Sequence, residues 1–153
     1  MIIIGIDPDI DKSGIAVYNS DTGILNFYNK CFFDLLSEIS WQIDEAYDVI
    51  VLIECGYLNK SNWHATKNKA KYAAAIGAKV GANHQISRLL VEFCEREMID
   101  YKEIQPKRKK INHKDFIRVS GLDFKRTNQE QRDAAMLILN SNEYLIKKSK
   151  VNR

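Results

Sequence analysis

The chain opens on Ile2-Ile3-Ile4-Gly5-Ile6-Asp7, a short apolar run that stops on a carboxylate. A run this short and this rich in isoleucine is typical of a buried strand. Residues 14–18 and 24–28 are two more apolar runs, and the turn-forming stretch Asn19–Gly23 separates them. The sequence therefore predicts a meander of three antiparallel strands at residues 2–6, 14–18 and 24–28.

A helix and a fourth strand are expected next. Residues 34–47 place apolar side chains at helical spacing, with Asp34 as the N-cap. Residues 49–53 then form the most apolar strand of the chain, which ends at Glu54. Because parallel strands need a long crossover connection, a strand, a helix and a strand in this order favour a parallel pair.

The rest of the chain is predicted to be mainly helical. The expected segments are irregular structure at 55–68, a helix from about 69 to 98, a strand at 100–105, and helices from 112 or 113 to 119 and from 127 to 140. We therefore expect one α/β domain over residues 1–142, in which helices flank a mixed five-stranded sheet. A basic, flexible tail is expected over residues 143–153.

Composition places the chain among ordinary globular proteins. Of its 153 residues, 45% are hydrophobic and 28% are charged, which excludes collagen-like and disordered chains. No apolar stretch approaches the roughly 18 residues of a membrane-spanning helix, and no secretory leader is expected. Three cysteines without a Cys-x-x-Cys pair favour neither a disulfide framework nor a zinc site. We expect a cytoplasmic protein in a reducing compartment, with no membrane partner.

Charge is divided unevenly along the chain. Residues 1–50 carry a net charge of −7, whereas residues 51–153 carry +10. The positive charge is concentrated in two stretches, 55–71 and 105–126. A segregated basic surface favours a polyanionic partner, nucleic acid first among them. The alternative is a basic face that is merely solvated.

Four carboxylates are candidates for a metal site. Asp7 and Glu54 each follow an apolar strand directly, and neighbouring strands can bring such residues together at one edge of a sheet. The last predicted helix adds Glu130 and Asp133, which are three residues apart and share a helical face. Clustered carboxylates repel one another unless a pKa rises or a cation binds, and hard oxygen ligands suit Mg²⁺ or Mn²⁺.

Each acid also has a purely structural interpretation. Asp7 can start a turn with the proline that follows it, and Glu54 can end a strand in solvent. Glu130 can complete a capping box with Thr127. The four acids considered together favour the metal site.

Ordered motifs carry a resemblance to a known family. Ile4-Gly5-Ile6-Asp7-Pro8, followed by Ser13-Gly14-Ile15-Ala16-Val17, resembles the opening of RuvC-type Holliday junction resolvases in the RNase H-like superfamily. Three later segments are similar to the family's strand that ends in glutamate, its glycine-containing helix and its terminal DxxDAxA motif: Val51–Glu54, Gly77–Gly81 and Glu130–Ala135. The set spans roughly residues 2–140. The chain departs from the family at Asp9, where the family has glycine, and at Glu130, where it has aspartate.

The resemblance implies an RNase H-like fold and a Mg²⁺-dependent endonuclease that resolves four-way DNA junctions. The implied metal ligands are Asp7, Glu54, Glu130 and Asp133, with two Mg²⁺ ions per site, for which Mn²⁺ can substitute. Phosphodiester hydrolysis would use two ions about 3.5–4 Å apart. The family also implies a homodimer formed through the long helix, whose two-fold symmetry would match that of a four-way junction.

Basic and aromatic side chains are the expected DNA contacts, because lysines bind phosphates and aromatic rings stack on unpaired bases. The candidates are Tyr57, Lys60, Trp63, Lys67, Lys69, Lys107, Arg108, Lys109, Lys110 and Lys114. By the resemblance, Tyr57 is placed to open the junction centre and Lys114 to act at the phosphate that is cut. The alternatives are aromatic rings that fold back on the core and lysines that are only solvated.

Two other functions stay open. A nuclease with the same fold and metals could act on flaps, single strands or RNA–DNA hybrids. A non-catalytic DNA-binding relative is the third hypothesis, and the presence of Asp7, Glu54 and Asp133 together argues against it.

Overall fold

The computed structural model describes residues 1–46, 48–59, 70–107, 109–122 and 126–144, and for residues 70–73 the backbone alone. Its elements in chain order are β1 (Ile2–Asp7), β2 (Ser13–Asn19), β3 (Ile24–Lys30), α1 (Phe32–Glu45), β4 (Val49–Glu54), the 3-10 helix η1 (Gly56–Leu58), α2 (Ala70–Arg96), β5 (Asp100–Ile104), α3 (His113–Ser120) and α4 (Gln129–Leu139). No helix in the described part of the chain is both long enough and apolar enough to cross a membrane.

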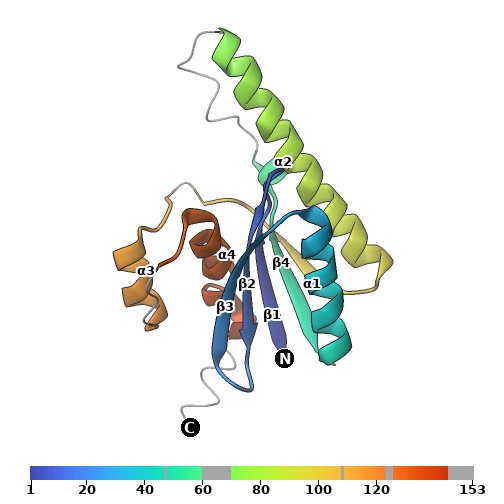
Figure 1. Ribbon diagram of the computed structural model, residues 1–153, viewed down its shortest axis with the longest axis vertical. Helices are drawn as coiled ribbons and strands as arrows, with labels where there is room; N and C mark the ends of the chain where they lie inside the picture. Colours follow the sequence, from blue (N-terminus) through green and yellow to red (C-terminus); the bar gives the residue numbers. More distant parts are fainter. Residues whose placement is uncertain (47, 60–69, 108, 123–125, 145–153) are drawn as a thin grey trace.

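Five strands form one mixed sheet in the order β3-β2-β1-β4-β5. The first three strands make the predicted antiparallel meander, and β4 and β5 pair in parallel beside β1. Helices cover both faces: α1 and α2 lie on one side, and α3 and α4 on the other (Figure 1). The structure thus confirms the predicted RNase H-like arrangement of a meander plus parallel strands.

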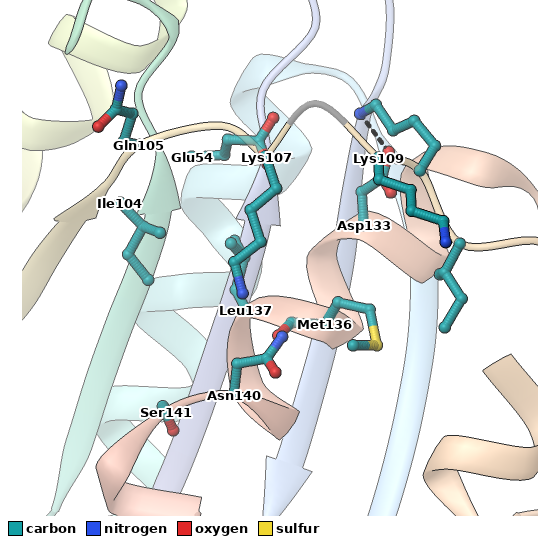
Figure 2. Close-up of a pocket in the computed structure, with 12 residues that line it drawn as sticks. Glu54, Ile104, Gln105, Lys107, Lys109, Asp133, Met136, Leu137, Asn140 and Ser141 are labelled. Carbon is teal, nitrogen blue, oxygen red and sulfur yellow. Dashed lines mark hydrogen bonds and ion pairs between the residues drawn. The ribbon is translucent and has the colours of Figure 1, made fainter. Parts of the chain in front are cut away.

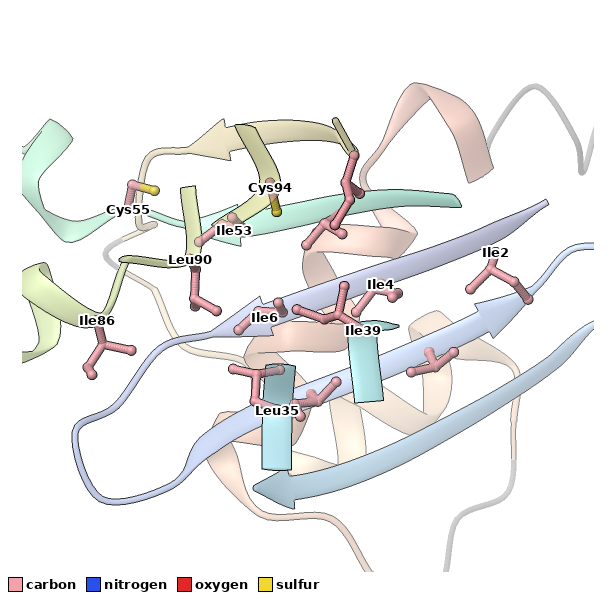
Figure 3. Close-up of a cluster of buried hydrophobic side chains, with 14 residues drawn as sticks. Ile2, Ile4, Ile6, Leu35, Ile39, Ile53, Cys55, Ile86, Leu90 and Cys94 are labelled. Atoms are coloured by element: carbon pink, nitrogen blue, oxygen red, sulfur yellow. The ribbon is translucent and has the colours of Figure 1, made fainter. Parts of the chain in front are cut away.

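Alternation along β1 divides its side chains between two cores. Ile2, Ile4 and Ile6 pack toward Leu35 of α1 and Leu90 of α2 (Figure 3). The opposite face of the sheet packs against α4 and the buried Phe116 of α3. Successive side chains of a strand point to opposite faces, and residues 2–6 of β1 are all buried. Both faces of β1 therefore have to be apolar, which explains why the strand carries no polar side chain before Asp7.

The N-cap of the first helix lies three residues earlier than the sequence predicted. Cys31, not Asp34, is the N-cap of α1, and the backbone N–H of Leu35 donates to the Cys31 carbonyl at 2.9 Å. Asp34 lies instead in the first turn, where a carboxylate is favoured by the positive end of the helix dipole. The predicted Asp34 N-cap is therefore wrong.

The ends of the long helix and of the last strand also differ slightly from expectation. The helix α2 stops at Arg96, and the next residues leave it through Met98, whose φ of 54° is left-handed. The N–H of Ile99 then donates to the Cys94 carbonyl at 2.8 Å, which closes the helix end. The strand β5 ends at Ile104, one residue before the predicted end.

A basic, flexible tail was expected over residues 143–153, and residues 145–153 lie outside the part of the chain that the structure describes. Its first two residues contact the domain: the ammonium of Lys102 pairs with Glu143, and the ring of Tyr144 lies edge-on to Tyr18 with centroids 5.0 Å apart.

Candidate active site

Asp7 and Glu54 leave the sheet at the same edge. Ile6 lies opposite Ile53 in the parallel register of β1 and β4, so the acidic residue that follows each is at the same level. Side chains alternate between the two faces of a strand, so Asp7 lies on the same face as Ile3, and Glu54 on the same face as Leu52. That face packs against α4. The sheet therefore delivers two carboxylates to the face that α4 covers.

Two glycines let α4 approach that face closely. A β-carbon added at Gly5 would overlap the backbone carbonyl of Ala134, and one added at Gly14 would overlap the backbone of Glu130. Gly14 pairs with Asp7 across β1 and β2. The absence of a side chain at Gly14 thus brings the start of α4 directly over the end of β1, next to Asp7.

The start of α4 is fixed by a capping box one residue later than the interpretation offered from the sequence. The Asn128 side chain accepts from the N–H of Gln131 at 2.9 Å, and the Gln131 side chain accepts from the N–H of Asn128 at 3.1 Å. The Thr127–Glu130 capping box is therefore wrong. Glu130 is a first-turn acid whose carboxylate this cap does not use.

Asp133 lies buried on α4, with 8% of its surface exposed. Gln129 donates to its Oδ1 at 2.8 Å, and the ammonium of Lys110 pairs with its Oδ2. Lys110 comes from the linker between β5 and α3. Arg132 ties that linker to α4, because its Nε donates to the carbonyl of Ile111 at 3.1 Å.

The carboxyl groups of Asp7 and Glu54 are affected both by burial and by neighbouring charges. Burial raises the pKa of Asp7 to about 7, and the charges of Glu54, Asp133 and Glu130 add to the rise, while Lys110 opposes it. Burial likewise raises the pKa of Glu54, against the opposing charge of Lys110 and together with that of Asp133. Asp7 therefore lies within electrostatic range of the three other predicted acids.

Lys110 is the positive centre of this group. Burial alone would lower the pKa of Lys110, but the hydrogen bond to Asp133 and the charges of Asp7 and Glu54 raise it overall. The sequence assigned Lys114 to the reacting phosphate and Lys110 only to DNA contact. In the described part of the chain, the lysine that pairs with a site carboxylate is Lys110, whereas Lys114 is exposed on α3, and its role stays a prediction.

The donor set suits a hard cation by its chemistry. Carboxylate oxygens are the ligands that Mg²⁺ prefers, and a cation would relieve their mutual repulsion. As the described side chains stand, no three Asp, Glu, His or Cys residues are grouped closely enough to hold a metal ion. The ammonium of Lys110 contacts Asp133 instead. Metal binding by the four acids stays a prediction.

The loop after Asp7 is tied to α2 through Asp9. Asn83 donates to the Asp9 carboxylate at 3.1 Å and accepts from the N–H of Ile10 at 2.9 Å. Lys79 lies 3.4 Å from the carboxylates of both Asp9 and Asp11. The sequence indicated only that Asp9 departs from the resembled motif, and its partners on α2 could not be identified from it.

Tyr57, on η1, packs within the protein. Its hydroxyl hydrogen-bonds to Glu103, its ring lies edge-on to His84, and Arg88 lies over the ring at 4.7 Å from its centroid. This position fits the alternative in which the aromatic ring folds back, and DNA contact by Tyr57 stays a prediction. Five other candidates lie outside the described residues: Lys60, Trp63, Lys67, Lys69 and Arg108.

Lys107 and Lys109, both exposed, line a cavity of about 300 Å³ that adjoins the carboxylates (Figure 2). Glu54 and Asp133 belong to its wall. The cavity was not expected from the sequence, since its lining comes from β4, β5, the following linker and α4.

Comparison with known proteins gives the fold. No family model and no curated protein matches the chain in sequence. Among solved structures, it is similar to "T. thermophilus RuvC in complex with Holliday junction substrate", with 11% sequence identity and a TM-score of 0.51. The similarity covers 99% of this chain and 96% of that one. The chain therefore has the RuvC-like, RNase H-like α/β fold over nearly its whole length.

Proposed function

We propose that this chain is a metal-dependent endonuclease that cuts branched DNA, with four-way junctions as its substrate. One observation carries the proposal: Asp7, Glu54 and Asp133 come from three separate elements, and burial together with the charges of Glu54 and Asp133 raises the pKa of Asp7 to about 7. The shared fold with RuvC, whose solved structure holds a Holliday junction, supports a branched substrate.

The metal ligands in this proposal are Asp7, Glu54, Glu130 and Asp133, for two Mg²⁺ ions, with Mn²⁺ able to substitute. Such ions, when bound, activate water and stabilise the charge that develops on the phosphate. Gln129 keeps Asp133 oriented through its hydrogen bond to Oδ1. Since Lys110 pairs with Oδ2 of the same carboxylate, it has to release that oxygen before the oxygen can become a ligand.

Lysines of the linker between β5 and α3 would hold the DNA backbone. Lys107 and Lys109 are exposed beside the carboxylates, and Lys110, once released from Asp133, can reach a phosphate there. Arg132 anchors this linker at Ile111. Lys114 is proposed as a further phosphate contact from α3.

A homodimer through α2 is part of the proposal. The N-terminal half of α2 projects beyond the sheet (Figure 1). A β-carbon added at Gly77 or Gly81 would meet no described atom within 4 Å, so these positions leave room for close approach by a second helix. Sedimentation velocity is expected to give a dimer, and a strict monomer even with junction DNA would contradict this part.

The nuclease proposal is tested by cleavage of a four-way junction against linear duplex, flap, single-strand and RNA–DNA hybrid controls, each with Mg²⁺. The junction is expected to be cut preferentially, and Asp7→Asn is expected to abolish cutting while junction binding persists. Preferential cutting of a flap, a single strand or a hybrid would overturn the junction assignment. Cleavage by Asp7→Asn at the normal rate would overturn the site.

A further inference from the structure

The cavity beside the carboxylates has the size of a small-ligand pocket. Its volume of about 300 Å³ lies at the lower end of the range of about 300–1,000 Å³ for ligand sites. The linker after β5 and the C-terminal half of α4 enclose it, and Glu54 and Asp133 stand at the end nearest the proposed site of cleavage (Figure 2).

Apolar side chains provide much of its lining. Ile104, Ile111, Met136 and Leu137 contribute from β5, the linker and α4. None of the twelve lining residues of this described cavity is aromatic. A phosphate group alone gains nothing from such a surface, whereas the flat face of a nucleobase is removed from water there.

Polar and basic groups surround the apolar lining. Lys107 and Lys109 extend from the linker toward α4 (Figure 2), and Lys110 completes a group of three cations. Asn140 and Ser141 line the cavity at the end of α4. The Asn140 amide N–H donates to the Met136 carbonyl at 2.6 Å, which leaves its Oδ1 as the acceptor for a ligand, and the Ser141 hydroxyl accepts from the Tyr144 N–H at 3.2 Å. A pocket lined by apolar side chains, by lysines and by a few other polar groups offers surfaces for both halves of a nucleotide, its base and its phosphates.

We propose that this cavity binds the base of one unpaired nucleotide next to the phosphate that is cut. The linker lysines neutralise the adjoining phosphates, the apolar side chains cover the base, and Asn140 contacts its edge. This inference rests on the proposed nuclease function and deepens it: recognition would require a nucleotide that can leave the stack, as at a branch point, and would favour some bases over others.

The chain offers a direct probe, because its three methionines are Met1, Met98 and Met136. Only Met136 among them lines the cavity, and Met98 is 92% exposed. Protein labelled with ¹³C at the methionine methyl groups is titrated in EDTA, so that no metal-dependent cutting occurs. Met136→Leu, a change that nearly conserves volume, assigns its signal.

Three kinds of ligand are compared in this titration: single-stranded tetranucleotides of each base, an abasic tetranucleotide of the same length, and inorganic phosphate. The Met136 methyl is expected to shift with at least one base-bearing strand, at an affinity about tenfold above that of the abasic strand. The Met1 and Met98 methyls are expected to stay in place. Equal shifts with the abasic strand or phosphate, or no Met136 shift at all, would overturn the proposal.

A variant that fills the cavity provides the second arm. Met136→Trp is expected to lower the affinity for the base-bearing strand to that of the abasic strand. Leu139→Trp, on the same helix but outside the cavity lining, is expected to keep the normal affinity, and the titration of unsubstituted protein stands whether or not either variant folds. The titration does not measure cutting, so its result is independent of the cleavage test. A protein that binds the base here but cuts no substrate in that test would overturn the nuclease proposal and leave the cavity assignment intact.

Discussion

Lys110 and Asp133 form an ion pair across 23 residues of sequence, and the Asp133 carboxylate is 8% exposed. The lysine therefore serves as the counter-charge of a buried acid. It also lowers the pKa of the neighbouring Asp7 and Glu54 relative to burial alone.

Replacement of this lysine tests its role. Lys110→Met is expected to lower the free energy of unfolding in EDTA by about 1–3 kcal/mol, because a buried acceptor loses its charged partner. Added Mg²⁺ is expected to stabilise this variant more than the parent protein, since the cation no longer competes with an ammonium. Urea denaturation with and without Mg²⁺ measures both effects. Lys109→Met, exposed on the same linker, is the control, and equal behaviour of the two variants would contradict the prediction.

The close seat of α4 on the sheet makes Gly14 intolerant of any side chain. Gly14→Ala is expected to cost about 3 kcal/mol of stability and to abolish cleavage, because the new β-carbon would overlap the Glu130 backbone. The control is Ser40→Ala, at an exposed position on α1. There the substitution is expected to stabilise by at most about 0.5 kcal/mol, because alanine is the better helix former. Thermal unfolding compares the two, and a harmless Gly14→Ala would refute this account of the helix position.

The raised pKa of Asp7 predicts that the free energy of unfolding falls as pH rises. Its pKa rises from 3.8 to about 7 on folding, so between these values the folded state holds a proton that the unfolded state has lost. The contribution of Asp7 to the free energy of unfolding is fully present below pH 4 and is lost as pH rises through 7. The Asn side chain of Asp7→Asn does not ionise, so this variant avoids the loss of stability at high pH. In EDTA at pH 8 we expect it to raise the free energy of unfolding by about 2–4 kcal/mol.

The measurement for Asp7 is urea denaturation in EDTA at pH 5 and pH 8. The gain from Asp7→Asn is expected to be much larger at pH 8 than at pH 5. Asp44→Asn, which changes an exposed carboxylate on α1, is the control without such a gain. A gain from Asp7→Asn that does not change with pH would contradict the shifted pKa.

We expect DNA binding to weaken steeply with salt, because the linker lysines are proposed to neutralise phosphates. If Lys107 and Lys109 each neutralise one phosphate, then Lys107→Ala and Lys109→Ala each reduce the slope of log K against log salt concentration by about 1. Fluorescence anisotropy with junction DNA in EDTA measures the slope without cleavage. Arg96→Ala, exposed at the far end of α2, is the control. A slope that neither lysine changes would remove both from the DNA contact.

Local patterns in the sequence were sufficient for most elements. The isoleucine-rich run of β1 and the apolar run of β4 predicted both strands. Each run is apolar throughout because both faces of the strand are buried in the two cores. The start of α3 after Asn112 and its end at Gly121 also follow from local chemistry: the asparagine side chain accepts from Asp115 N–H, and the glycine takes a left-handed conformation.

Helix caps were less certain, because adjacent residues satisfied the same preference. Asp34 suits both an N-cap and a first-turn position, and the structure uses it in the first turn. Around α4 both Thr127 and Asn128 are good N-caps, and the pairing with Gln131 selects Asn128. Propensity alone does not separate such neighbours, since their energies differ by a few tenths of a kcal/mol up to about 1 kcal/mol.

The sequence by itself determined the sheet, its covering helices and the placing of Asp7 and Glu54 at strand ends, because these follow from the spacing of apolar residues within single elements. Only the tertiary structure decided that α4 rests on Gly5 and Gly14, that Lys110 rather than Lys114 pairs with a site carboxylate, and that a cavity adjoins the acids. The reason is physical. Each of these contacts joins segments far apart in the chain, and its energy arises from packing and charge between them rather than from the local preference of either segment.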